Sequence, residues 1–166
     1  MIITIKKMAK DLLINYFDEH SSFTVSVNLL TSGARKYIVF KPMISFVSTN
    51  KKIIQAVMAH LEMKNPITVV KQNNNIGYQV RVQDFKEINH VINTLNKDKL
   101  QYKRRVNSIE QFITLFTKIQ NIGHIHKEWK PEFVEILELK EQLNIKTRTR
   151  KGFTKTQWID KIKNHF

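Results

Sequence analysis

The sequence predicts an α+β fold in which helices cover one face of a four-stranded antiparallel sheet. Two stretches, at about residues 23–47 and 67–83, alternate apolar and polar residues with the period of a strand. Between and after them, apolar residues recur at helical spacing. The chain has 166 residues and a hydrophobic content of 42%, which suits one domain with a hydrophobic core. We therefore expect one domain over residues 1–145, followed by a basic arm and a short helix over residues 146–166.

The helices and strands can be placed along the chain from these periods. In chain order we expect a helix over about 7–18, strands over 23–29 and 35–47, a helix over 51–63, strands over 67–72 and 78–83, and helices over 84–95, 108–119, 131–144 and 154–162. Ser32-Gly33 predicts the turn between the first two strands. Pro42 interrupts the second strand, so we expect a bulge or a sheet edge there. Thr49-Asn50 is typical of the cap that precedes a helix.

The second half of the chain carries clear turn and capping patterns. The run Asn73-Asn74-Asn75-Ile76-Gly77 predicts the loop of a hairpin. Pro131 suits the first turn of a helix because its missing N–H would have no partner there. Three further helix starts have the spacing of a capping box, namely Asp84-x-x-Glu87, Ser108-x-x-Gln111 and Thr154-x-x-Gln157.

The charge balance points to an anionic partner. The chain has 28 Lys and Arg against 14 Asp and Glu, which gives a net charge of +14 and a pI of about 10.0. Such a surface attracts polyphosphates, although a merely soluble basic protein is the alternative. The absence of cysteine excludes disulfides, thiol catalysis and zinc-finger sites within this sequence.

Targeting signals are weak. No apolar run reaches the length that spans a bilayer, so we expect no membrane contact. Residues 1–10 lack the pattern of a secretory signal or of a transit peptide. The sequence is rich in Lys, Asn and Ile, which is typical of an AT-rich coding genome. We therefore expect a mitochondrial protein that the organelle itself encodes.

Each expected strand has one apolar face and one polar, cationic face. If helices cover only the apolar face, the second face stays open and can read base edges and hold phosphates. An ordinary solvated sheet face is the alternative. The strand residues expected to bind nucleic acid are Thr24, Ser26, Asn28, Arg35, Tyr37, Lys41, Lys71, Gln79, Arg81 and Gln83.

Two basic runs extend this expected surface. The first consists of Lys103, Arg104 and Arg105. In the second, Lys146, Arg148 and Arg150 alternate with threonines, which favours an extended backbone with the three cations on one side. We expect this segment to bind phosphates as an arm; a basic linker is the alternative.

Patterns for catalysis are few. The sequence contains no phosphate-binding Gly-rich loop, no nucleophile elbow and no metalloprotease helix. His124 and His126 are expected to be surface histidines, because their spacing alone does not make a metal site. Asp18 and Glu19 are an acidic pair at an expected helix-to-strand junction.

That junction resembles a known signature. The run Leu13-Ile-Asn-Tyr-Phe-Asp18-Glu-His20-Ser21, followed by Ser22-Phe23-Thr-Val-Ser-Val27, is similar to the motif of the LAGLIDADG homing endonucleases. Segments 44–63, 103–105 and 127–144 follow the same order, so the resemblance covers about residues 10–150. It implies an αββαββα fold with helices on one face of the sheet and extra C-terminal helices. It also implies a sheet that reads DNA and a Mg²⁺-dependent cleavage site.

The sequence departs from that signature at the positions that do chemistry. His20 stands where the family has its metal-binding acid, and Ser21 where it has glycine. Mg²⁺ prefers carboxylate oxygens, so we expect no metal, no cofactor and no cleavage. Ile14 and Asn15 stand where small residues let two signature helices pack closely, so we do not expect a close homodimer through the first helix.

The sequence is consistent with two functions. The favoured one is a nucleic-acid-binding protein that has lost cleavage and binds structured RNA, as a mitochondrial ribosomal RNA component or an intron-maturase-like protein. Ribosomal or other ribonucleoprotein partners would then be expected. The competing one is an active Mg²⁺-dependent DNA homing endonuclease with a shifted acid, for which Asp18, Glu19 and Lys103 are the catalytic candidates.

Overall fold

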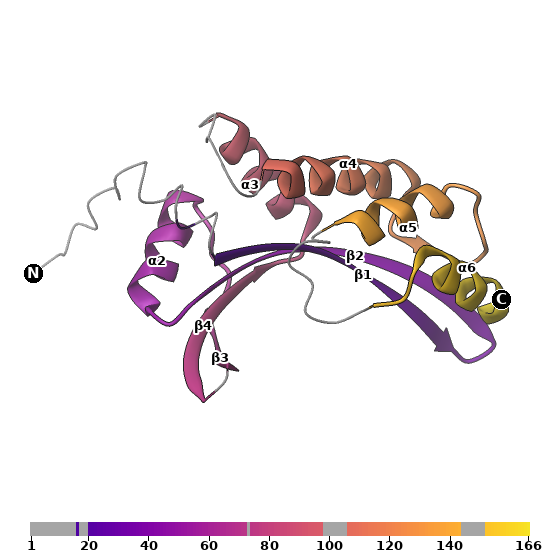
Figure 1. Cartoon of the computed structure of the whole chain (residues 1–166), viewed down its shortest axis with the longest axis horizontal. Helices are drawn as coiled ribbons and strands as arrows, with labels where there is room; N and C mark the ends of the chain where they lie inside the picture. The colour runs from indigo at the N-terminus through magenta and orange to yellow at the C-terminus, as the bar shows by residue number, and fades with distance from the viewer. Residues whose placement is uncertain (1–15, 17–19, 73, 98–105, 144–151) are drawn as a thin grey trace, which may run out of the picture. The chain divides into compact units, whose positions relative to one another are not determined.

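The computed structural model describes residues 16, 20–72, 74–97, 106–143 and 152–166 (Figure 1). Its elements are β1 (Ser21–Ser32), β2 (Arg35–Ser48), α2 (Lys51–His60), β3 (Thr68–Gln72), β4 (Asn75–Val82), α3 (Phe85–Lys97), α4 (Val106–Ile122), β5 (Ile125–His126), α5 (Phe133–Gln142) and α6 (Lys155–His165). The strand order is β1-β2-β4-β3, and β5 pairs with β2. The α+β prediction is confirmed, with one strand more than the sequence predicted.

Contacts divide the chain into two compact units. The first unit comprises residues 1–22 and 43–106, and the second comprises residues 23–42 and 107–166. The predicted boundary between residues 145 and 146 lies outside the described residues, so that division stays a prediction. In the described part of the chain, no helix has both the length and the apolar character needed to cross a membrane.

In the first unit, α2 and α3 pack on a sheet formed by β4, β3 and the end of β2. The register runs from Ile44↔Val82 to Ser48↔Tyr78 between β2 and β4, and from Thr68↔Gln79 to Gln72↔Asn75 between β3 and β4. The fully buried side chains of this unit include Ile44, Phe46, Ile54, Val57, Leu61, Val80, Val82, Ile88 and Val91. They are the apolar positions that the helical and strand periods predicted.

Caps fix where these two helices begin. The Asn50 side chain accepts a hydrogen bond from the Lys52 backbone N–H (3.0 Å), as predicted for α2. The Asp84 carboxylate accepts from the backbone N–H groups of Lys86 (2.8 Å) and Glu87 (3.2 Å) at the start of α3. Each cap of this kind stabilises a helix by about 1 kcal/mol.

The hairpin between β3 and β4 is tighter than predicted. The expected loop over residues 73–77 is wrong, because β4 already begins at Asn75 and Gly77 lies inside the strand. Asn74 supplies the left-handed conformation of the turn, with φ of +67°. A Cβ on Gly77 would lie 3.2 Å from Val70 Cγ2, so glycine here lets the two strands approach closely.

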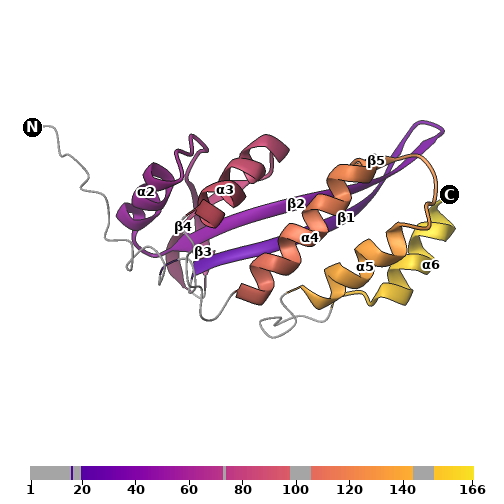
Figure 2. The same ribbon diagram turned by 90° about the horizontal axis from the view of Figure 1, so that it is seen from above.

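In the second unit, α4 and α5 lie on one side of the β1–β2 hairpin, and α5 and α6 lie side by side (Figures 1 and 2). Aromatic rings fill the core: Phe23 lies 5.3 Å from Phe112, and Phe40 lies 5.1 Å from Phe133, between centroids. Each fully buried ring stabilises the fold by roughly 1.5–3 kcal/mol. Gly33 makes the predicted turn with φ of +59°.

Pro42 does not produce a bulge, but it lies at a local edge of the sheet, which is one of the two expected outcomes. The buried residues Ile38, Phe40 and Ile44 keep a period of two across it, which an extra residue would have shifted. The Phe40 N–H donates to the His124 carbonyl (2.9 Å), so the nitrogen of Pro42, two residues on, faces the same side. There β2 passes from its β5 partner to its β4 partner, and a missing donor costs the sheet little.

Candidate nucleic-acid interface

The hairpin of the second unit carries a polar face turned away from α4 and α5. On β1, Phe23, Val25 and Val27 are buried, so the residues between them point the other way. On β2, the alternation that buries Ile38 and Phe40 places Arg35, Tyr37 and Lys41 on the other side, where Val39 alone among residues 35–41 of that side is buried. We call this surface the β1–β2 face; it comprises Thr24, Ser26, Asn28, Arg35, Tyr37 and Lys41, of which Ser26, Arg35 and Lys41 are exposed and the others half-buried.

The sheet of the first unit carries a similar polar face on β4. Cross-strand pairing puts Arg81 opposite Ser45, and Gln79 opposite Val47 and Thr68. Gln79 Oε1 accepts a hydrogen bond from Arg81 Nε at 2.8 Å. We call Gln79, Arg81 and Gln83 the β4 face; Gln83 Nε2 lies 3.4 Å from the sulfur of Met43.

The cations on these two faces are available to an anion. In the part of the chain that the structure describes, no carboxylate lies within ion-pair distance of Arg35, Lys41 or Arg81. The bond to Gln79 holds Arg81 by Nε and leaves both terminal nitrogens of its guanidinium to a ligand. A held guanidinium suits two-point contact with a phosphate or a guanine edge.

Lys71 does not lie with Arg81. The register pairs Lys71 with Ile76 and Val69 with Tyr78, and these residues share a face with the buried Val80. Since side chains alternate along a strand, Lys71 projects to the side opposite Arg81. The structure thus separates one predicted binding residue from the others of its sheet.

The remaining predicted site residues lie outside the described residues, so their roles stay predictions. They are Asp18, Glu19, Lys103, Arg104, Arg105, Lys146, Arg148 and Arg150; the helix-packing positions Ile14 and Asn15 also lie outside.

His20 is described; it is helical and directly precedes β1. Its ring is half-buried and lies 4.4 Å from the ring of Tyr16, and the next residue, Ser21, is buried. Imidazole offers Mg²⁺ a neutral nitrogen in place of carboxylate oxygen. Among the described residues, no group of three His, Asp or Glu side chains could hold a metal ion. Imidazole at position 20 therefore does not supply the carboxylate oxygen that the Mg²⁺ site implied by the resemblance needs, and Asp18 and Glu19 lie outside the described residues.

The prediction that both His124 and His126 are surface residues is wrong for His126. Pairing of β5 with Ile38 turns His126 into the core, where its ring lies 4.8 Å from that of Phe133. Its Nε2 lies 2.9 Å from the Gly123 carbonyl oxygen, to which the neutral ring donates. Desolvation by burial is the main cause that lowers the pKa of His126. His124 is exposed, as predicted.

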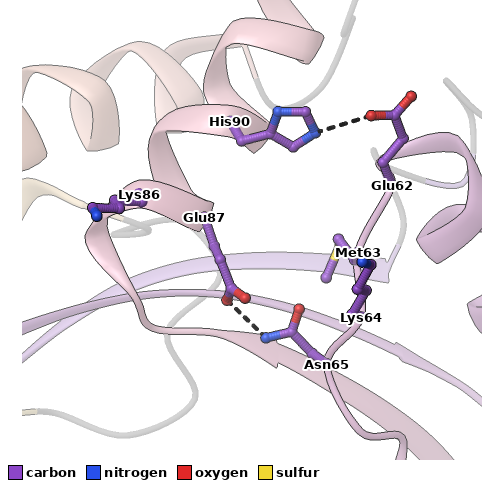
Figure 3. A pocket seen from close by; sticks show the side chains of 7 residues that line it. All are labelled: Glu62, Met63, Lys64, Asn65, Lys86, Glu87 and His90. Carbon is purple, nitrogen blue, oxygen red and sulfur yellow. Dashed lines mark hydrogen bonds and ion pairs between the residues drawn. The ribbon is translucent and has the colours of Figure 1, made fainter.

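Sequence reasoning also missed a small cavity between the end of α2 and α3 (Figure 3). It measures about 250 Å³, below the roughly 300–1,000 Å³ of typical ligand sites. Asn65 Nδ2 donates to the Glu87 carboxylate (2.9 Å), and His90 Nε2 lies 3.9 Å from the Glu62 carboxylate. The capping pattern had predicted that Glu87 turns back on its own helix; this contact to Asn65 could not be predicted from spacing.

The similarity of this chain to known proteins is found in its structure and not in its sequence. No protein-family model and no curated protein matches the sequence. An archaeal intron-encoded homing endonuclease complexed with DNA matches with a TM-score of 0.70 at 19% identity, over 94% of this chain and 95% of that one. The group I intron-encoded homing endonuclease I-CeuI complexed with DNA matches with a TM-score of 0.71 at 14% identity, over 94% and 77%. The LAGLIDADG homing endonuclease I-GzeII in complex with its DNA target matches with a TM-score of 0.65 at 14% identity, over 92% and 48%.

The chain therefore has the fold of the LAGLIDADG homing endonucleases, and the fold that the signature implied is confirmed. At these identities the likeness establishes the fold alone.

Proposed function

We propose that this chain binds nucleic acid through the β1–β2 face and the β4 face. The observation that carries the proposal is the set of cations on these faces, Arg35, Lys41 and Arg81, which have no carboxylate partner among the described residues. Each face also carries hydrogen-bonding side chains, and the net charge of +14 supplies a long-range attraction. Proteins of the same fold are known in complex with DNA, which supports the same class of ligand here.

Structured RNA is the partner that we propose, bound without cleavage. Phosphate and base contacts need no metal centre, whereas hydrolysis of a phosphodiester by this fold would need carboxylate ligands where His20 stands. A mitochondrial ribosomal RNA or a group of organelle introns is the target class we propose, because the composition of the sequence is typical of an AT-rich organelle genome.

Ultraviolet cross-linking of the full chain in its native organelle, with sequencing of the attached nucleic acid, tests both the ligand and its type. We expect RNA reads, and cross-linked peptides that contain Tyr37 or residues 79–83 of the β4 face. Cross-links confined to peptides of α2 and α3 would contradict binding through the sheet faces, and DNA reads would contradict the choice of RNA.

The competing function is an active DNA endonuclease, and the matched structures of endonucleases bound to DNA support it. Incubation of plasmid DNA with the chain and Mg²⁺ or Mn²⁺ is expected to yield no cut, since imidazole at position 20 is a poor ligand for these ions. Cleavage that disappears in the Asp18→Ala variant would establish the endonuclease instead. The variant His20→Asp is the matched control, because it places a carboxylate at the position where the family has its metal-binding acid.

A further inference from the structure

The helix α6 carries aromatic rings and lysines that the sheet faces do not account for. Phe153, just before α6, is 43% exposed, and its centroid lies 5.2 Å from that of Trp158. Lys161 Nζ lies 4.4 Å from the centroid of Phe153, and Lys140 Nζ of the neighbouring α5 lies 5.5 Å from that of Trp158. We call these four residues the α6 patch; they belong to the second unit, whose α5 and α6 lie side by side (Figure 2).

Helix capping explains part of this arrangement. Thr154 is the N-cap of α6 and forms a capping box with Gln157. Phe153 therefore precedes the cap and Trp158 follows four residues after it, which is the spacing of a hydrophobic staple. A staple needs only an apolar contact, and a leucine would provide it. It does not explain why the Phe153 ring is exposed with an ammonium group over its face.

The patch is held in place by packing beneath it. Ile162 on the inner side of α6 is fully buried, and the Lys155 backbone N–H donates to the Glu141 carboxylate of α5 (2.9 Å). The Lys155 ammonium lies 3.5 Å from the Glu138 carboxylate. Since the apolar side of α6 is already covered, the helix has no free apolar face to insert into a lipid surface. The exposed ring of Phe153 and the half-buried ring of Trp158 are thus held at the start of a well-packed helix.

A site that combines a cation with an aromatic ring can bind both parts of an unpaired nucleotide, the phosphate and the base. Every base has a π-face that stacks on an aromatic ring, and every phosphate attracts an ammonium group. Three cation–ring pairs involve α6 or the residue before its cap, and two of them lie within the α6 patch. In the described part of the chain, Lys161 has no carboxylate partner, so its ammonium group can serve a phosphate.

We propose that the α6 patch binds the unpaired bases of single-stranded nucleic acid, with Phe153 as the stacking ring and Lys161 on the adjacent phosphate. This binding goes beyond the sheet faces and does not depend on them. It gives the chain a second contact with a structured RNA, at a loop or a single-stranded end.

Two probes of equal charge separate stacking from simple attraction. One is a labelled oligouridine of roughly 20 nucleotides; the other is an abasic strand with the same number of phosphates. The full chain is expected to bind oligouridine at least fivefold more tightly than the abasic strand. Phe153→Leu keeps the apolar contact with Trp158 but has no π-face, so it should lose this preference. Phe153→Trp should retain it.

Several results would overturn the proposal. Equal affinity for the two strands would show that only phosphates are bound, and wild-type affinity of Phe153→Leu for oligouridine would reduce Phe153 to a staple. Binding of anionic phospholipid vesicles that Phe153→Leu abolishes, without any preference for oligouridine, would assign the patch to a membrane surface.

Matched controls separate this site from the sheet faces. Lys161→Gln should weaken oligouridine binding more than Lys51→Gln, which removes an exposed lysine on α2. Phe153→Leu should leave the affinity for a fully paired RNA duplex unchanged, whereas Arg81→Gln should lower it. Failure of the α6 patch is thereby distinguishable from failure of the proposed sheet function.

Discussion

His126 lies in the core of the second unit, in contact with the rings of Phe40 and Phe133. The sequence around it, Gly123-His-Ile-His126, holds only a short alternation, and nothing in that spacing states which residue faces inward. Pairing with Ile38 decides it, and this contact joins residues far apart in the chain. A buried histidine of this kind makes stability depend on pH.

The free energy of unfolding is expected to fall as pH decreases through the ordinary histidine pKa of 6.5. Burial lowers the pKa of His126 in the folded chain, so below that pH the unfolded chain binds more protons and is favoured. Urea unfolding at about pH 7.5 and about pH 5.5 measures this loss. His126→Gln, which cannot be protonated, should reduce it, whereas the exposed control His124→Gln should not. Equal pH dependence in wild type and His126→Gln would contradict the account.

Glu62 adopts a left-handed conformation, with φ of +52°, directly after Leu61, the C-cap of α2. The following N–H, of Met63, donates to the Met58 carbonyl at 2.9 Å, which closes the helix in the manner that usually requires glycine. Glu62→Gly is therefore expected to raise stability by about 1 kcal/mol, seen as a higher Tm. Its carboxylate lies 3.9 Å from His90 Nε2 and is exposed, so the loss of this contact costs little. Alanine at this position keeps the backbone strain, so an equally large rise in the Tm of Glu62→Ala would contradict this explanation.

At the scale of elements, strand register decides which cations can act together. The sequence placed Lys71 and Arg81 in one set because both stand in predicted strands with polar neighbours. The register between β3 and β4 turns them to opposite faces, and the tight turn at Asn74 sets that register. A loop of five residues, as the sequence suggested, would not have determined which residues of β3 and β4 pair.

This difference gives a matched pair of variants on one hairpin. Arg81→Gln is expected to weaken RNA binding about tenfold, whereas Lys71→Gln removes an equal charge and should weaken it by about twofold or less. Fluorescence anisotropy with a labelled RNA hairpin measures both. Equal losses would mean that overall charge alone drives binding, and a larger loss from Lys71→Gln would place the ligand on the other face.

Over the whole molecule, local patterns predicted most of the fold. The alternation of β1 and β2, the apolar spacing of α2 to α6 and the caps at Asn50 and Thr154 were all correct, because each depends on residues close in sequence. The two-residue strand β5 could not be predicted, since it is too short to show a period. The sheet faces depend on the same alternation, so the exposure of Arg35, Lys41 and Arg81 could be predicted from the sequence. That no described carboxylate lies near these cations could be seen only in the folded structure.

The salt dependence of RNA binding tests the central claim most directly. Each phosphate contact by Lys or Arg releases condensed counterions, so the logarithm of the association constant should fall steeply as the logarithm of salt concentration rises. The combined variant Arg35→Gln, Lys41→Gln and Arg81→Gln should make that slope less negative by about two to three, close to one for each lost contact. A triple variant of exposed lysines on α2 and α3, Lys51→Gln, Lys52→Gln and Lys86→Gln, controls for net charge and should change it by less than one such contact. A wild-type slope near zero, or equal slopes for the two triple variants, would contradict binding through the sheet faces.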